Sequence, residues 1–486
     1  MKNMSEPDHT GAIEFSEYPH ARHLTADGSY VTMVYTADSD YLLAADGLGF
    51  SGTACEQGVL APLTHENAVQ LRKLFPFTAP SPVLRRKRSI GLGDRLGLAT
   101  PGQLRAVMEY DAYPILAQQS VRELALTGRS FEQVLDDVSF AVFREDFQHP
   151  FGADGDHLKK PEEIGQALSA GYTMITLDCS EHIRNDVAVL TDEEVLARYQ
   201  PDTALEQKYI GRDFIVSPAL KLHFGAEDFR RMVLIYGEAI AFITKVYAEH
   251  IQSRDVDFEI SIDETMTPTT PLQHFFVAKE LIDRGIRFAT IAPHFCGEFQ
   301  KGVDYIGSLA QFDAELAEHT AIAEHFGYKL SVHSGSDKFS IFPSVGRITG
   351  GHFHLKTAGT NWLEAMKLVS IKAPALYREI HAFALEAFSE AAKYYHVTTD
   401  LLRIPPLSAL RDEQLPALFD QNDARQLIHI TYGLILQAKN EDDSSRFRTR
   451  LYGLWRAYSE DYAKMLHAHI GHHLQQLYSQ IPQQTL

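Results

Sequence analysis

The amino-acid sequence predicts an α/β protein: a TIM-like (β/α)8 barrel with an N-terminal β-rich segment, an insertion after the fourth strand and a helical C-terminal extension. Three observations predict this class. Eight stretches begin with apolar or β-branched residues and end in polar, often ionisable ones. Helical patterns separate most of these stretches, which is typical of a parallel α/β sheet. The polar residues fall at the strand ends, where barrel enzymes build their sites.

The elements follow in order along the chain. Residues 1–85 are the β-rich segment, because stretches such as SYVTMVY alternate apolar and polar residues. The eight strand stretches are 89–97, 114–120, 151–157, 172–182, 257–265, 286–295, 328–338 and 351–362. Helical patterns cover 130–143, 271–285 and 312–327, and the last ends at Gly327, a favoured C-cap residue. The catalytic barrel therefore spans 86–365 with an insertion at about 180–256, and residues 366–486 form the helical extension.

A doubly wound open sheet would also alternate strands and helices. It would more commonly carry a glycine-rich phosphate turn after its first strand. Gly91, Gly93 and Gly97 resemble such a turn but lack the GxGxxG spacing. The barrel is therefore favoured over the open sheet.

Composition excludes several classes of partner. The chain has 486 residues, a formal net charge of -19 and three cysteines far apart in sequence. Such an acidic chain repels phosphate backbones and anionic lipid, so we expect neither nucleic acid nor a membrane as partner. The polar N-terminus MKNMSEPDHT is not a signal peptide, and no apolar run is long enough to span a bilayer. We expect a cytoplasmic protein, and its oligomeric state is left open, a homo-oligomer included.

Histidines at strand ends suggest a metal centre. His157, His333 and His354 come from three different strand stretches. Imidazoles from separate strand ends can converge on one divalent cation and leave a position open for substrate. The competing interpretation for each is a hydrogen-bonded structural histidine. The cluster HAHIGHH (467–473) belongs to no such set of strand ends, and we interpret it as outside the site.

Charged residues at the same ends indicate acid–base chemistry on an anionic substrate. Asp263 and Glu264 are neighbours on a strand and point to opposite faces, so one enters the site while the other supports the loop. Asp156 stands beside His157 in the same way and can accept a proton from a hydroxyl group that a metal has acidified. Groups that could bind a carboxylate or phosphate, or the hydroxyls of a sugar, are Arg95, Lys159, Glu298, Lys338 and Lys356, with Gln300 and Lys301 nearby.

Several long strings together are specific enough to name a family. GLGDRLGLATPG, FGADGDHLK, ITLDCSEHI, FEISIDETMTPTTPLQHFFVAKEL, GEFQKGVDYIG, YKLSVHSGSDKFSIFP and HLKTAGTNWLEA resemble the tagaturonate epimerase family from about residue 90 to 366. The resemblance implies a metal-dependent isomerase of hexuronate catabolism that interconverts D-tagaturonate and D-fructuronate. It implies Asp156 as proton acceptor, Glu264 as proton donor, and His157 with His333 and His354 as metal ligands. Position 294 is His where Arg is expected in relatives, and whether His294 or His352 joins the site is open.

The expected chemistry is inversion at carbon 4, in ketose numbering. The hydrogen on carbon 4 lies one atom beyond the position that the carbon 2 carbonyl acidifies, so simple proton exchange is unfavourable. Retro-aldol cleavage of the carbon 3–carbon 4 bond through a metal-bound enediolate, followed by re-addition to the other aldehyde face, avoids this difficulty. Direct deprotonation is the alternative mechanism. The metal is Zn, Ni, Co or Mn. Two other functions are alternatives: a metal-dependent aldolase of the tagatose phosphate type, and a non-catalytic sugar-acid sensor.

Overall fold

The computed structural model describes residues 14–357 and 359–482, which divide into two compact units. The first comprises the chain up to Ala79 together with Ser139–His149, and the second comprises Pro80–Val138 and the chain from Pro150 onward. The barrel and the C-terminal helices fall in the same unit, so their predicted division at residue 365 stays a prediction. The N-terminal decapeptide, on which we based the absence of a signal peptide, lies outside the described residues.

The first unit is an antiparallel sheet with one covering helix. Its elements are β1 (Ser16–Leu24), β2 (Tyr30–Tyr35), β3 (Asp40–Ala44), β4 (Thr53–Cys55), β5 (Gly58–Pro62) and α1 (His65–Leu74). The strand order is β1-β2-β3-β5-β4. Val31 and Met33 alternate inward along β2 and pack with Leu71 of α1. The predicted β-rich segment is confirmed.

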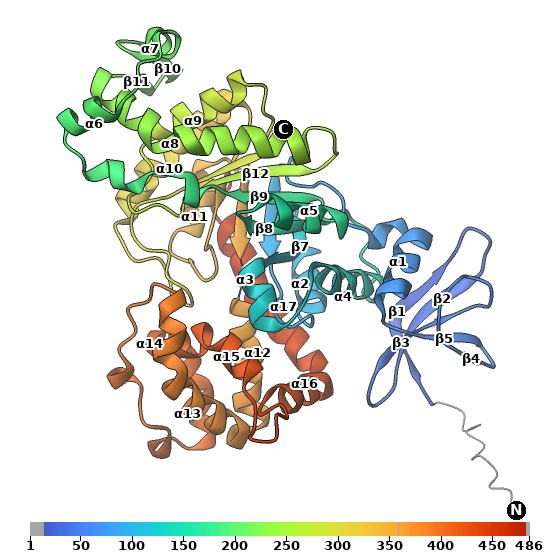
Figure 1. Ribbon diagram of the computed structural model, residues 1–486. Coiled ribbons are helices and arrows are strands. Elements are labelled where there is room, and N and C mark those ends of the chain that lie inside the picture. Colours follow the sequence, from blue (N-terminus) through green and yellow to red (C-terminus); the bar gives the residue numbers. More distant parts are fainter. Residues whose placement is uncertain (1–13, 358, 483–486) are drawn as a thin grey trace, which may run out of the picture. The chain divides into compact units, whose positions relative to one another are not determined.

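The second unit contains a closed parallel barrel of eight strands (Figure 1). In chain order the strands are β6 (Arg88–Leu92), β7 (Tyr113–Ser120), β8 (Gly152–Leu158), β9 (Met174–Asp178), β12 (Asp257–Ile262), β13 (Thr290–Pro293), β14 (Lys329–Val332) and β15 (Phe353–Thr357). β15 pairs with β6, and β9 pairs with β12, so no edge remains. The barrel is confirmed and the open-sheet alternative is wrong.

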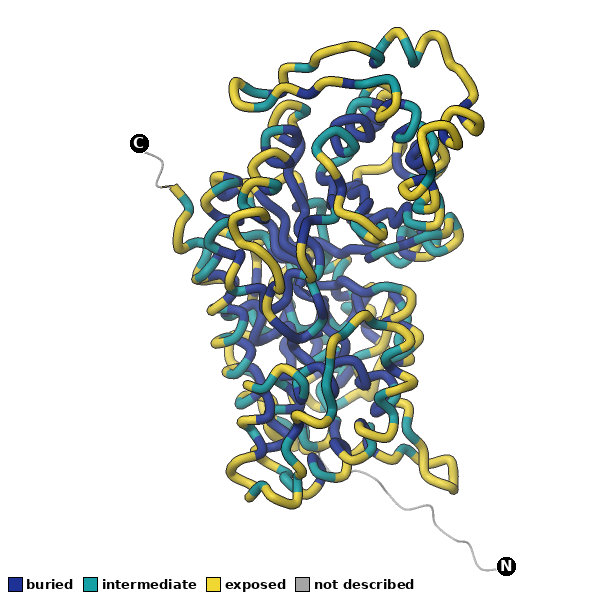
Figure 2. The backbone as a smooth tube through the Cα atoms, turned by 90° about the vertical axis from the view of Figure 1, so that its left-hand side faces the viewer, coloured by how far each residue is buried: buried dark blue, intermediate teal, exposed yellow. Residues whose placement is uncertain are grey.

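Helices cover the barrel, and the strands are buried along most of their length (Figure 2). The helices between strands are α2 (Thr100–Val107), α3 (Val121–Thr127), α4 (Phe131–Arg144), α5 (Pro161–Ser169), α9 (Pro271–Asp283), α10 (Leu309–Phe326) and α11 (Phe342–Ile348). The sequence Thr-Pro-Leu-Gln starts α9, because Thr270 and Gln273 cap each other's backbone N–H groups. α10 ends at Gly327, whose φ is 80°, as predicted.

Two additions complete this unit. The insertion between β9 and β12 contains α6 (Asp192–Arg198), α7 (Thr203–Tyr209), the hairpin β10 (Asp213–Ser217) and β11 (Leu220–His223), and α8 (Ala226–Val246). After β15 come α12 (Thr360–Lys372), α13 (Pro374–Ala391), α14 (Asn422–Ile430), α15 (Tyr432–Gln437), α16 (Arg448–Ala457) and α17 (Ser459–Tyr478). The last helix packs against α2, α11 and α12. Among the described helices, none is long and apolar enough to cross a membrane.

Candidate active site

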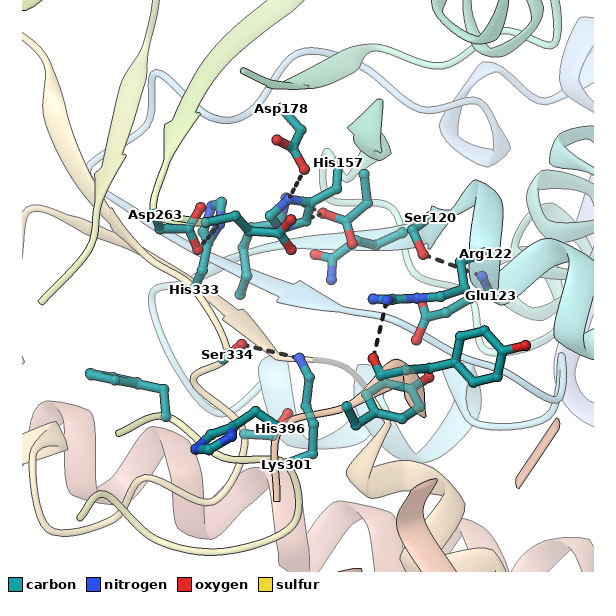
Figure 3. A pocket seen from close by; sticks show the side chains of 18 of the residues that line it. Ser120, Arg122, Glu123, His157, Asp178, Asp263, Lys301, His333, Ser334 and His396 are labelled. Carbon is teal, nitrogen blue, oxygen red and sulfur yellow. Dashed lines mark hydrogen bonds and ion pairs between the residues drawn. The ribbon is translucent and has the colours of Figure 1, made fainter. Parts of the chain in front are cut away.

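A cavity of about 630 Å³ opens at the carboxyl ends of the barrel strands (Figure 3). Eight of the ten predicted site residues line it: Arg95, Asp156, His157, Lys159, Glu264, His333, Lys338 and Lys356. Glu298 and His354 do not. Residues up to 261 positions apart in the sequence, Arg95 and Lys356, therefore share one cavity.

His157, His333 and Asp263 form one group of potential metal ligands there, and His157, Asp178 and Glu264 form another. In each group, one ligand atom from each residue lies within 4.8 Å of the others. The two imidazole rings are 4.9 Å apart between centroids, and His333 Nδ1 lies 3.1 Å from Asp263 Oδ2. Two imidazoles and one carboxylate suit the divalent cations that we expected from the sequence.

Local backbone geometry directs two of these side chains. On β12 the side chains alternate, so Asp263 follows Glu259 and Ser261 on the inner face while Glu264 turns to the rim. His157 would point away from Asp156 on a regular strand. Its φ is 51°, and the β8–β9 register shifts between Gly155 and Leu158, so a bulge turns the imidazole toward His333.

Carboxylates hold the outer nitrogens of both imidazoles. His333 Nε2 lies 2.8 Å from Glu259 Oε1, and His157 Nδ1 lies 3.4 Å from Asp178 Oδ2. Such carboxylate–imidazole pairs orient metal ligands and raise their basicity. His157 Nδ1 and Asp178 Oδ2 are buried and face each other without a hydrogen bond of good geometry. The donor set and its supports therefore fit a divalent cation.

His354 lies apart from this group. It is on the inner face of β15, two residues before Lys356 and thus deeper in the barrel. Its Nδ1 is 3.0 Å from Ser89 Oγ, and burial lowers its pKa to about 3. The geometry supplies Asp263 where the sequence suggested His354, whose role as a ligand stays a prediction.

Lys356 forms the floor of the cavity together with three carboxylates. Its ammonium lies 2.7 Å from Asp154 and 3.3 Å from Glu259, and it also pairs with Asp156. Burial raises the pKa of Asp156, but the charges of Lys356 and His157 outweigh it and hold that pKa below its usual value. Burial likewise raises the pKa of Asp154, to about 6. Asp156 is therefore ionised and able to accept a proton at neutral pH.

The rim acid Glu264 is on the other side of His157. It lies 3.5 Å from Lys159, whose ammonium is also 3.4 Å from Asp178. Asp156 Oδ1 is 3.9 Å from His157 Nε2, whereas Asp178 faces Nδ1. Asp156 thus lies beside Nε2, and Glu264 is grouped with Asp178, the carboxylate that faces Nδ1.

The predicted anion-binding residues differ in whether their polar groups are already used by other parts of the protein. Lys338 donates to the carbonyl oxygens of Gln300, Val303 and Ser336, which uses its three N–H donors. Arg95 is paired with Glu123 at 2.9 Å and lies over the Tyr432 ring, but its Nη1 has no hydrogen-bond partner. Glu298, outside the cavity, pairs with His396. Their roles in substrate binding stay predictions.

The other histidines singled out in the sequence lie in different surroundings. His294 lines the cavity and its Nδ1 is 3.1 Å from Thr265 Oγ1. His352 precedes β15 and is exposed. In the HAHIGHH cluster, His469 and His473 lie 3.1 and 3.3 Å from the carboxylate of Asp337, outside the cavity lining. Arg425 also binds that carboxylate, and His473 Nε2 accepts the Asp337 N–H, so these contacts join α17 to the loop after β14.

Sequence reasoning did not select three residues that shape the site. Asp178, Glu259 and Asp154 support the histidines or Lys356. An acid at the end of a strand was the available signal for Asp178. A charged residue in the middle of an otherwise apolar strand was the signal for Glu259.

Comparisons with known proteins agree with this geometry. The sequence profile described as tagaturonate epimerase (UxaE) matches residues 30–477. A tagaturonate/fructuronate epimerase of Thermotoga maritima is 42% identical over 439 residues, 89% of each chain. A crystal structure of the fructuronate-tagaturonate epimerase UxaE from Cohnella laeviribosi, complexed with one glycerol, is 51% identical with a TM-score of 0.93 and covers 95% of this chain and 96% of its own. The native structure of that enzyme is 50% identical with the same TM-score, covering 96% of each chain. The chain therefore belongs to the tagaturonate epimerase family, a family of isomerases.

Proposed function

We propose that this protein interconverts D-tagaturonate and D-fructuronate by inverting carbon 4, with a divalent cation held by His157, His333 and Asp263. The observation that supports it most is the convergence of these three ligands beside Asp156 and Glu264 in one cavity of a chain that belongs to this family. The family's named substrates, quoted above for the relatives, supply the substrate pair. The cytoplasmic location stays the expectation from the sequence.

The proposed route is retro-aldol cleavage and re-addition. A carboxylate removes the proton of the carbon 4 hydroxyl, and the electrons of the carbon 3–carbon 4 bond move to carbon 3 as the carbon 4 aldehyde forms. A bound divalent cation would supply the Lewis acidity that stabilises the resulting enediolate. The aldehyde then rotates so that its other face meets carbon 3. The carbon 3–carbon 4 bond reforms, and the new carbon 4 alkoxide takes a proton.

The protein's own residues supply the two proton transfers. Asp156, kept ionised by Lys356, accepts the hydroxyl proton on one face. Glu264, on the opposite side of His157, donates on the other face, and the roles exchange in the reverse direction. Lys159 between Glu264 and Asp178 holds the rim acid in place.

Incubation of the purified protein with D-fructuronate, with and without a chelator, tests the reaction. We expect D-tagaturonate as the product, and loss of turnover with the chelator that added divalent metal reverses. Substrate deuterated at carbon 4 should keep its label, because no bond to that hydrogen breaks. Label lost to solvent would instead show direct deprotonation. Net release of two fragments would favour the aldolase, and unchanged sugar would favour the sensor.

Metal content of variants tests the ligand set. His157→Ala, His333→Ala and Asp263→Asn should each lower the bound metal and the turnover, and removal of ligand-supporting contacts alone typically costs 10–100-fold. His354→Gln is the matched histidine control, which should keep its metal because His354 lies deeper in the barrel. Metal lost from the His354 variant and kept in the Asp263 variant would contradict the set.

A further inference from the structure

The cavity is lined by seven lysines and arginines and by seven carboxylates, but not all of these cations are paired with a carboxylate. Of its seven lysines and arginines, four are already committed: Arg95 to Glu123, Lys159 to Asp178 and Glu264, Lys356 to its three carboxylates, and Lys338 to carbonyl oxygens. Within the described part of the chain, no ion pair joins Arg122, Lys160 or Lys301 to a carboxylate. Lys160 is exposed at the N-terminus of α5. Lys301 is half-buried. Because a charge removed from water needs a counter-charge, Lys301 is the strongest candidate of the three to bind an anion.

Lys301 points into the cavity toward Ser334 (Figure 3). Its ammonium donates to Ser334 Oγ at 3.0 Å, and Ser334 directly follows His333. That bond uses one of three donors. Two N–H groups therefore remain for a ligand that is held next to His333.

Arg122 lies on the same side of the cavity. Its Nη1 is 3.4 Å from the carbonyl oxygen of Tyr394, and its guanidinium lies 5.2 Å from the centre of the Tyr395 ring. These contacts orient a side chain that would otherwise move freely at the rim. Figure 3 shows Arg122 and Lys301 across the cavity from His157 and Asp263.

The charges around Lys301 favour an anion there. Burial lowers its pKa, and Arg95 and Arg122 lower it further, whereas Glu123 and Asp156 raise it. Both of those carboxylates are already paired, with Arg95 and Lys356 respectively. A carboxylate brought by a ligand would supply the missing counter-charge.

We propose that Lys301, assisted by Arg122, binds the carbon 6 carboxylate of the substrate. This inference rests on the proposed function and extends it. Retro-aldol cleavage leaves that carboxylate on the three-carbon aldehyde made of carbons 4 to 6. A fragment anchored through its carboxylate can turn its aldehyde face without leaving the cavity. Lys301 therefore favours re-addition, which gives the epimer, over release of the fragments, which is the outcome of an aldolase. Because it acts on a part of the substrate remote from the reacting carbon, Lys301 is a binding residue and performs no proton transfer.

Lys301→Met tests the proposal, with Lys160→Met as the matched control at the same cavity. The readouts are KM and calorimetric Kd for D-fructuronate, the inhibition constant of D-fructose, which has a hydroxymethyl group in place of the carboxylate, and trapped three-carbon aldehyde. Lys301→Met should weaken D-fructuronate binding roughly 10- to 100-fold, as loss of a charged hydrogen bond does. It should leave D-fructose inhibition unchanged and increase the trapped aldehyde. Lys301→Arg should restore much of the affinity, and Lys160→Met should change little.

Equal weakening of both sugars, or no weakening of D-fructuronate, would overturn the role of Lys301. Failure of the proposed function looks different: the wild-type protein itself would then not epimerise D-fructuronate. The calorimetric comparison of the two lysine variants would still show whether Lys301 binds the carboxylate.

Discussion

Lys356 is a single side chain on which both the stability of the barrel and the ionisation of Asp156 depend. It lies within the barrel among Asp154, Asp156 and Glu259, which together carry more negative charge than it can neutralise. Buried charges are tolerated only when they are paired and hydrogen-bonded. The lysine therefore stabilises the fold and keeps Asp156 ionised at the same time.

Lys356→Met should be strongly destabilising, by about 3–5 kcal/mol, because it leaves buried carboxylates without their counter-charge. The free energy of unfolding in urea measures this. Lys372→Met removes the lysine of a surface pair with Asp461 and should have little effect. A Lys356 variant as stable as the wild type would show that protonation of Asp154 compensates for the lost charge.

Strand ends and helix ends in this barrel are specified by different rules. The alternation of side chains along β12 is sufficient to predict that Asp263 and Glu264 point to opposite faces. β8 departs from alternation, because its bulge brings His157 to the same side as Asp156. Helix ends followed local rules closely, as the caps of α9 and α10 show.

The C-cap of α10 gives a prediction with a control of opposite sign. Gly327 has a φ of 80° and open space where a Cβ would lie, so Gly327→Ala should cost about 1 kcal/mol from backbone strain alone. Gly237 lies in the exposed interior of α8, also with open space, and Gly237→Ala should stabilise the protein by roughly 0.5–1 kcal/mol. Urea unfolding measures both. Effects of the same sign would contradict this explanation.

For the whole molecule, buried histidines couple stability to pH. His319 of α10 and His274 of α9 lie 2.9 Å apart between their Nδ1 atoms, and Tyr328 contacts His274. Burial lowers the pKa of His319 from 6.5 to about 4, although Glu315 acts in the opposite direction. Between these values the unfolded chain binds the proton and the folded chain does not, so acid favours unfolding.

Stability should therefore fall as the pH drops from 6.5 toward 4, with His319 contributing up to roughly 3 kcal/mol. His319→Gln should reduce the difference between unfolding free energies measured at pH 7 and pH 5. The control is His325→Gln, which changes an exposed histidine on the same helix and should leave that difference as in the wild type. An unchanged difference in the His319 variant would assign the acid sensitivity to other groups.

The eight strand stretches, the helices between them and the polar residues at their ends follow from the amino-acid sequence alone. These features depend on periodicity and capping, which act over a few residues. They were enough to place His157, His333, Asp156 and Glu264 in one cavity, whereas the family resemblance rested on the long residue strings quoted above.

The depth of each residue in that cavity, the direction of its side chain and its charge partners depend on the folded structure. His354 and Lys356 are two residues apart on one face of β15, yet one lies deep beside Ser89 and the other reaches the cavity. Lys338 and Lys301 both line the cavity. Lys338 donates all three of its N–H groups to backbone carbonyls, whereas Lys301 uses only one, on Ser334. The physical reason is that barrel closure and strand stagger set which layer a residue occupies, and long-range contacts set which charges are already neutralised.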